Sequence, residues 1–213
     1  MPDVARILDI PKRQVSYWVS EYIKGKIKDR SGFTFHKVHG GQSVVNFHSL
    51  IETFTFFHLK EKGIKTNVIL EAHELLSKRY RTLYPFAHAD MLRAGGEVLF
   101  SELDKDGKEL LIGATKALQL KLKLSSTLEK FSHKLTFGQD HLADAFRPLG
   151  RNSTVLISPH HQFGQPTISG TNILVDTIGE LAEAGETKKR IKSIYELTDR
   201  QVNDAITYFR RAA

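Results

Sequence analysis

The last third of the chain constrains the fold most, because turn-forming residues and helical hydrophobic spacing follow each other closely over residues 155–209. Residues 164–171 contain Gly164, Pro166 and Gly170. They favour a sharp turn, since glycine reaches positive φ and proline cannot donate a hydrogen bond to a neighbouring strand. Apolar residues then recur at helical spacing and stop at Gly185. This pattern predicts a strand over residues 154–158, a turn and three short helices.

Each of the three predicted helices has its own signal. The first two carry apolar stripes, and the third begins with Thr198-Asp199-Arg200-Gln201, which has the form of a capping box. A basic run at residues 188–192 precedes the last helix. Short helices behind a basic turn are typical of a helix-turn-helix unit rather than an enzyme active site. The apolar residues of these three helices are Val175, Ile178, Leu181, Ala182, Ile191, Ile194, Val202, Ala205, Ile206 and Phe209.

This segment also resembles a bacterial family catalogued as domain of unknown function 433. The resemblance lies in Phe163-Gly164-Gln165-Pro166, Gly170-Thr171, Glu183-Ala184-Gly185-Glu186 and Tyr195-Glu196-Leu197-Thr198. Members of the family are often described as antitoxins encoded beside toxins with a PIN-like nuclease fold. The resemblance therefore implies that the chain neutralises such a toxin.

Composition narrows the class of protein. The 213 residues carry a net charge of +7 and no cysteine, so disulfides and thiolate zinc sites are excluded and a cytoplasmic location is expected. No apolar run is long enough for a membrane helix, and the first residues lack the pattern of a signal peptide. The basic excess lies mainly in residues 1–90, which suits a polyanionic partner or a solubilising surface.

The first twenty residues predict two short helices joined by a turn at Asp9-Ile10. Pro11 suits the first position of the second helix, where its missing N–H is harmless. Apolar residues lie on one face of this helix, and basic and polar residues lie on or near the other. A hairpin is predicted to follow, with turns at residues 29–32 and 39–42. This is the plan of a winged helix-turn-helix.

The second helix and the hairpin supply the predicted DNA contacts. A helix fits the major groove, where Arg or Lys can read guanine, Gln can read adenine and hydroxyl groups can bind phosphate. Basic residues of the hairpin would contact the backbone as a wing. The predicted DNA-binding residues are Lys12, Arg13, Gln14, Ser16, Tyr17, Lys28, Arg30 and Lys37. The alternative is a helical hairpin used for protein contacts.

Residues 3–82 resemble a MerR-type DNA-binding domain. The resemblance lies in the run from Asp3 to Pro11, in Val15-Ser16-Tyr17-Trp18, and in Phe57-His58-Leu59-Lys60-Glu61-Lys62-Gly63-Ile64-Lys65. It implies DNA binding. The chain departs from the usual pattern in a longer wing loop over residues 37–43, and it lacks the cysteines of metal-sensing members.

Between these ends the sequence predicts two longer helices, over residues 48–62 and 66–82. A hairpin is expected around residues 104–107, and residues 116–134 fit either a helix or a strand because both periodicities occur there.

Enzyme and metal signals are weak. The histidines of His36-Lys37-Val38-His39 and the pair His160-His161 lack further ligands at a useful spacing. No P-loop or nucleophile elbow is present in the sequence. Asp140 and Asp144 would share a helix face without an evident partner. We expect no metal, no cofactor and no catalytic activity.

The overall prediction is a mainly α-helical α+β chain in three parts: a winged helix-turn-helix over residues 1–84, an α+β connector over 85–150 and a C-terminal helical domain over 151–213. The resemblances imply a type II antitoxin that represses its own operator as a homodimer and inhibits a PIN-like ribonuclease. Arg210 and Arg211 are candidates for contact with the toxin's acidic centre. The alternative is a one-component MerR-like regulator whose connector senses a small molecule.

Overall fold

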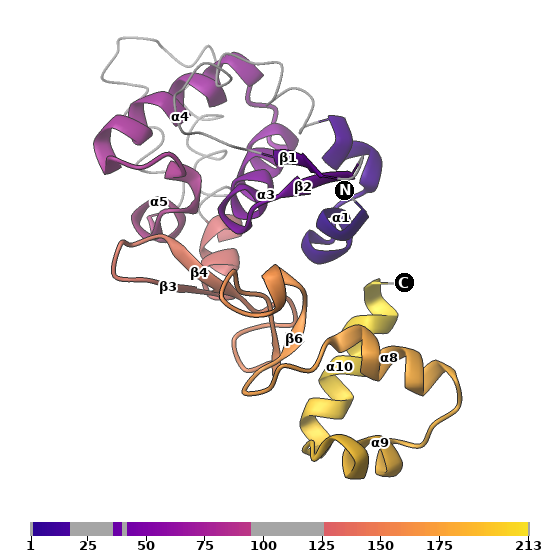
Figure 1. Ribbon diagram of the computed structural model, residues 1–213. Helices are drawn as coiled ribbons and strands as arrows, with labels where there is room; N and C mark the ends of the chain where they lie inside the picture. Colours follow the sequence, from indigo (N-terminus) through magenta and orange to yellow (C-terminus); the bar gives the residue numbers. More distant parts are fainter. Residues whose placement is uncertain (1, 18–35, 40–41, 95–125, 213) are drawn as a thin grey trace.

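The computed structural model describes residues 2–17, 36–39, 42–94 and 126–212. In these residues helices predominate and the strands form three separate two-stranded sheets, so the predicted α+β class is confirmed. Figure 1 shows a larger body that carries the N-terminus and a smaller body of three helices that carries the C-terminus. The two ends of the chain lie close together (Figure 1).

The N-terminal elements agree with the predicted pattern. Helix α1 spans Pro2–Leu8, Asp9 turns the chain with φ of 58°, and a second helix covers residues 12–17. Strands β1 (His36–His39) and β2 (Gln42–Val45) pair antiparallel. The segment over residues 37–43, predicted as a long loop, is therefore mostly a hairpin. The first predicted hairpin and the one around residues 104–107 lie outside the described residues.

Helices α3 (Phe47–Glu61) and α4 (Thr66–Tyr80) lie where the sequence predicts them. Asn46 begins α3 as its N-cap, since its side-chain oxygen accepts a hydrogen bond of 2.8 Å from the Ser49 amide. Gly63, at φ of 82°, ends it. A short turn η2 (Pro85–Ala87) and helix α5 (Ala89–Arg93) follow.

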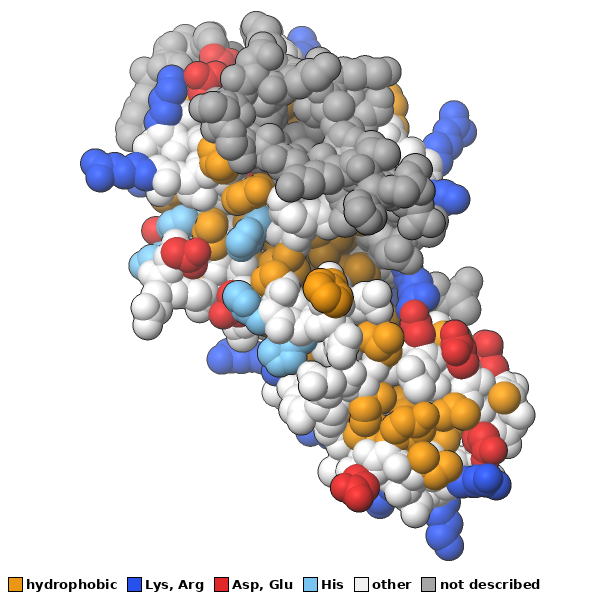
Figure 2. All heavy atoms as spheres, in the orientation of Figure 1, with side chains coloured by type: hydrophobic (Ala, Val, Ile, Leu, Met, Phe, Trp, Pro, Cys, Tyr) orange, Lys and Arg blue, Asp and Glu red, His pale blue; other side chains and the backbone are white. Residues whose placement is uncertain are grey.

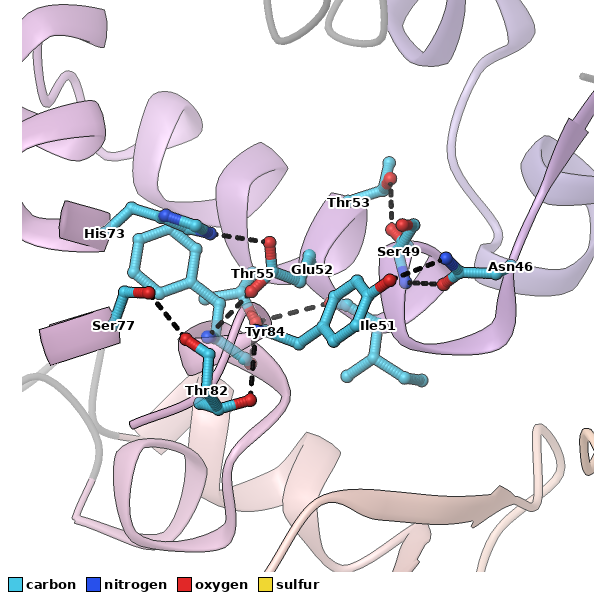
Figure 3. A network of polar contacts seen from close by, with 11 residues as sticks. Asn46, Ser49, Ile51, Glu52, Thr53, Thr55, His73, Ser77, Thr82 and Tyr84 are labelled. Carbon is cyan, nitrogen blue, oxygen red and sulfur yellow. Dashed lines mark hydrogen bonds and ion pairs between the residues drawn. The ribbon is translucent and has the colours of Figure 1, made fainter. Parts of the chain in front are cut away.

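A buried polar network joins α3, α4 and η2 (Figure 3). Glu52 is fully buried; its Oε2 lies 2.8 Å from Nε2 of the equally buried His73, and its Oε1 accepts a 3.0 Å hydrogen bond from the Phe86 amide. Thr55 donates a 3.2 Å hydrogen bond to the Phe86 carbonyl. A buried carboxylate needs such partners because an unpaired charge is costly in the interior. The network fixes the backbone two residues before His88.

A helix over residues 126–132 leads into the antiparallel pair β3 (Leu135–Phe137) and β4 (Ala143–Phe146). Residues 116–134, which fit either a helix or a strand in the sequence, are thus helical over the described residues 126–132. The prediction that Asp140 and Asp144 share a helix face is wrong: Asp140 lies in the turn after β3, and Asp144 lies in β4. The turn residues Gly138 to Leu142 favour a tight connection that a helix would not permit.

The C-terminal body begins with β5 (Val155–Leu156) and β6 (Thr167–Ile168), which pair antiparallel around the turn η3 (Gln162–Gly164). Gly164 and Gly170 adopt φ of 82° and 81°, as the predicted turn requires. Helices α8 (Val175–Glu183), α9 (Lys188–Tyr195) and α10 (Asp199–Ala212) follow. The capping box is confirmed, since Gln201 Oε1 accepts from the Thr198 amide and Thr198 Oγ1 accepts from the Gln201 amide.

Hydrophobic side chains of the described residues form two cores. The larger joins the N-terminal helices to residues of 128–157, and the smaller lies among β5, β6 and α8–α10. The three-part division stays a prediction, although residues 128–146 share the N-terminal core. Ile191 and Tyr195 of α9 pack in or against the smaller core, whereas Ile194 of the same helix is 58% exposed. None of the described helices is long and apolar enough to span a bilayer.

Candidate functional site

The helix over residues 12–17 presents a basic, polar face. Val15 is fully buried and anchors the helix to the larger core. The Gln14 and Val15 amides donate to the Pro11 carbonyl and close the first turn. The other side chains, which are the predicted base-reading and phosphate-binding groups, are all exposed: Lys12, Arg13, Gln14, Ser16 and Tyr17. These side chains are therefore accessible to a partner, and their contact with DNA stays a prediction.

The predicted wing contacts are only partly described. Lys28 and Arg30 lie outside the described residues. Lys37 lies in β1, paired with Val44 of β2. The hairpin and the helix over residues 12–17 thus come from the same end of the chain, but the wing contacts stay predictions.

The first helix of this unit is bound to the C-terminal body. Arg6 of α1 forms an ion pair with Asp176 of α8, and its guanidinium lies 6.0 Å from the centre of the Tyr208 ring of α10. Arg211 forms a second ion pair, with Asp9 at the end of α1. The two ion pairs join elements far apart in sequence. Figure 1 shows the C-terminal end of α10 near the N-terminal helices, as these pairs require.

Burial shapes the chemistry of this contact. It raises the pKa of the Tyr208 hydroxyl to about 12, against the smaller opposing effect of the Arg6 charge. Burial also lowers the pKa of Lys134, and the Arg211 charge acts in the same direction. Of the two predicted toxin-binding residues, Arg211 is engaged with Asp9, while Arg210 is exposed on α10.

Phe163 is an aromatic side chain that the fold leaves in solvent. It is 100% exposed, at the tip of η3. Gln162, Phe163 and Gly164 all have positive φ, at 44°, 55° and 82°. Three successive left-handed residues are costly for non-glycine side chains, and here they point a large apolar ring away from the core. No pattern in the sequence predicts this exposure, since the motif indicates only a turn.

Two histidines and a carboxylate meet where α5 contacts the β3–β4 turn. His88 comes directly before α5, Asp90 lies in its first turn, and His141 lies in the turn before β4. One potential ligand atom from each lies within 4.8 Å of those of the other two, the one such group among the residues described. Figure 2 shows histidine and acidic side chains gathering on this face.

Backbone contacts hold this histidine cluster, which we define as His88, Asp90 and His141. The Ala89 amide donates a 2.8 Å hydrogen bond to the His141 carbonyl, and His88 forms an isolated antiparallel bridge with Leu142. The His88 ring stacks on the Tyr80 ring at 4.0 Å between centroids. Burial lowers the pKa of His88, and the nearby Asp90 carboxylate partly opposes this shift.

His160 and His161 are exposed after β5 and belong to no such group among the described side chains. His36 and His39 lie at the two ends of β1, and their side chains lie outside the described ones. Spacing along the sequence does not indicate the histidine cluster, because His88 and His141 are far apart in the chain. Only the pairing of α5 with the β3–β4 turn brings them together.

Two relatives from Mycobacterium tuberculosis (strain ATCC 25618 / H37Rv) extend over most of the chain. One is an uncharacterized protein, Rv2308, at 23% identity, covering 98% of this chain and 88% of the relative. The other is named putative antitoxin VapB45, at 24% identity, covering 78% of this chain and 72% of that protein.

A solved structure and a family model add to this. The crystal structure of Rv2018 from Mycobacterium tuberculosis superimposes with a TM-score of 0.69 at 19% identity, and the match covers 95% of this chain and 94% of that chain. This likeness shows a shared fold. Residues 155–209, from β5 to α10, match the family model described as protein of unknown function (DUF433).

Proposed function

We propose that this chain is a type II antitoxin, which neutralises a PIN-like ribonuclease toxin and represses its own operator as a homodimer. The similarity to putative antitoxin VapB45 over 78% of the chain carries the antitoxin part of the proposal. The match of residues 155–209 to the DUF433 model supports it. The proposed protein has no catalytic activity of its own.

The proposed DNA contact uses the helix over residues 12–17. Its exposed Lys12 and Arg13 favour phosphate oxygens or guanine edges, and Gln14 favours adenine. Helix-turn-helix proteins usually bind paired half-sites as two-fold dimers. A dimer would place two such helices on one operator.

The proposed toxin contact uses the C-terminal body. The family resemblance implies a metal-dependent nuclease toxin whose acidic centre attracts cations. An exposed cationic side chain of the antitoxin fits such an acidic centre. Arg210 is exposed, whereas Arg211 is paired with Asp9. The fully exposed Phe163 adds an aromatic anchor of the kind that dominates binding energy at interfaces.

DNA binding is tested by gel shift on the fragment upstream of the gene. Lys12→Ala and Arg13→Ala should each weaken binding and lower the log–log salt slope by about one unit per lost phosphate contact. Lys130→Ala removes an exposed charge from the helix over residues 126–132, outside both proposed contacts, and is the matched control. If the double variant Lys12→Ala, Arg13→Ala binds as the control does at equal salt, the recognition helix is wrong.

Toxin neutralisation is tested by expressing the neighbouring gene with and without this chain. Growth arrest by the neighbour alone, relieved by wild type and by Lys12→Ala, Arg13→Ala, supports direct neutralisation. Arg210→Ala and Phe163→Ala should relieve the arrest less well than Lys130→Ala. A neighbour that is harmless alone, or that never copurifies with the chain, refutes the antitoxin function and favours the one-component regulator.

A further inference from the structure

We propose that His88, Asp90 and His141 form a zinc-binding site that ties α5 to the β3–β4 turn. Two imidazoles and one carboxylate are ligands that Zn²⁺ accepts, and three protein ligands leave a fourth position for water. The three side chains offer one ligand atom each within 4.8 Å of the others. The site is independent of the proposed toxin and DNA contacts.

The backbone around the site is fixed before any metal binds. The 2.8 Å hydrogen bond from Ala89 to the His141 carbonyl and the bridge between His88 and Leu142 hold the two histidine positions side by side. His88 directly follows η2 in the chain. In η2 the Phe86 amide donates to Glu52 and the Phe86 carbonyl accepts from Thr55, so this backbone is fixed. A site on such a rigid base loses little entropy when the ligands gather.

His88 and Asp90 already face each other. Nδ1 of His88 lies 3.9 Å from Oδ2 of Asp90 and 3.3 Å from the Asp90 amide nitrogen. Ligand atoms around a tetrahedral zinc ion at about 2.0–2.2 Å are about 3.3–3.6 Å apart, so the Nδ1–Oδ2 separation needs only a small contraction. The long amide hydrogen bond to Nδ1 would be replaced by the bond to zinc.

The third ligand must move further than the other two. The His141 ring lies nearly parallel to the His88 ring, with centroids 5.6 Å apart, and it must turn so that one nitrogen faces the ion. His141 and Asp90 are both exposed, the Asp90 side chain by 59%. No tight packing therefore opposes these rotations, whereas the buried His88 stays in place.

Charge around the site also favours a cation. The Asp90 carboxylate is a ligand, and Asp140 lies close enough to His88 to attract positive charge there. The nearest opposing group on α5, Arg93, has its guanidinium 4.8 Å from the centre of the Phe137 ring. Asp140 Oδ1 accepts a 3.1 Å hydrogen bond from the Leu142 amide, so this second carboxylate is held beside the site.

The test is calorimetric titration of the metal-free, untagged full chain with ZnCl₂. We expect one tight site per chain, weakened at least about tenfold by His141→Ala and by Asp90→Asn. Both positions are exposed, so these variants leave the packing around the buried His88 intact. His133→Ala is the matched control, because His133 is also exposed and its Nε2 lies 4.0 Å from Glu129 on the helix over residues 126–132.

Two further measurements sharpen the test. Zinc should raise the melting temperature of wild type and of His133→Ala but not that of His141→Ala, since a ligand that binds only the folded state stabilises it. MgCl₂ in large excess should not compete, because imidazole is a poor ligand for magnesium. Absence of zinc binding by wild type, or equal affinity in His141→Ala, Asp90→Asn and wild type, would overturn the assignment.

Discussion

Gly179 of α8 is the position where one added methyl group should disturb the C-terminal body most. A Cβ atom there would lie 2.0 Å from Cγ and 2.2 Å from Cδ2 of Phe209 on α10. Non-bonded carbon atoms prefer about 3.5–4.0 Å, so Gly179→Ala forces the ring or the helix to move by roughly 1.5 Å or more. Gly179 is buried, and α8 packs directly on α10 (Figure 1).

The expected magnitude follows from two opposing effects. Overpacking of this kind costs about 1–3 kcal/mol, while alanine in a helix interior gains about 1 kcal/mol over glycine. Because the overlap with the Phe209 ring is severe, the overpacking cost should lie in the upper part of its range, at about 2–3 kcal/mol. We therefore expect a net loss of about 1–2 kcal/mol in the free energy of unfolding of the C-terminal body. Hydrogen exchange of the slowest α10 amides measures this quantity separately from the larger core.

A double-mutant cycle provides the control. In a Phe209→Ala background the clash is gone, so adding Gly179→Ala should change sign and stabilise by up to about 1 kcal/mol. A neutral or stabilising Gly179→Ala in the wild-type background would refute the predicted clash with Phe209. An effect of the same size in both backgrounds would also refute it.

Three further outcomes are expected. Glu52→Leu should lower the free energy of unfolding by about 3 kcal/mol in urea titrations, because it leaves His73 and the Phe86 amide without their buried acceptor; a loss under about 1 kcal/mol would contradict this. Burial lowers the pKa of His48 below 6.5, so the unfolded chain binds more protons near that pH and the melting temperature should fall as pH drops below about 6.5. His48→Asn should flatten that profile, and an unchanged slope would count against it. Arg6→Ala should speed hydrogen exchange in α1 and at the end of α10 by removing the contacts to Asp176 and α10, and unchanged exchange in both would disprove that link.

Local signals in the sequence were enough for most elements that the structure describes. The capping box at Thr198 and Gln201, the glycine turns at Gly164 and Gly170 and the stop at Gly185 each depend on residues a few positions apart, and all appear as predicted. The exposed face of the helix over residues 12–17 also follows from the sequence, because the apolar Val15 is buried and the polar residues around it face outward.

Predictions from local spacing failed where neighbours decide the outcome. Ile194 shares helical spacing with Ile191, yet Ile191 is buried in the smaller core and Ile194 is 58% exposed. Asp140 and Asp144 have helical spacing, yet the pairing of β3 with β4 makes their segment a turn and a strand. In each case the contact with another element outweighed the local preference.

The sequence by itself determined the helices, their caps and the turns, since these arise from interactions within a few residues. Only the tertiary structure decided that α1 binds the C-terminal body through Arg6 and Asp9, that Phe163 stands in solvent, and that His88, Asp90 and His141 meet. The partners in these contacts are separated by tens to about two hundred residues. Their meeting depends on how whole elements pack, and periodicity and spacing along one chain carry no record of that packing.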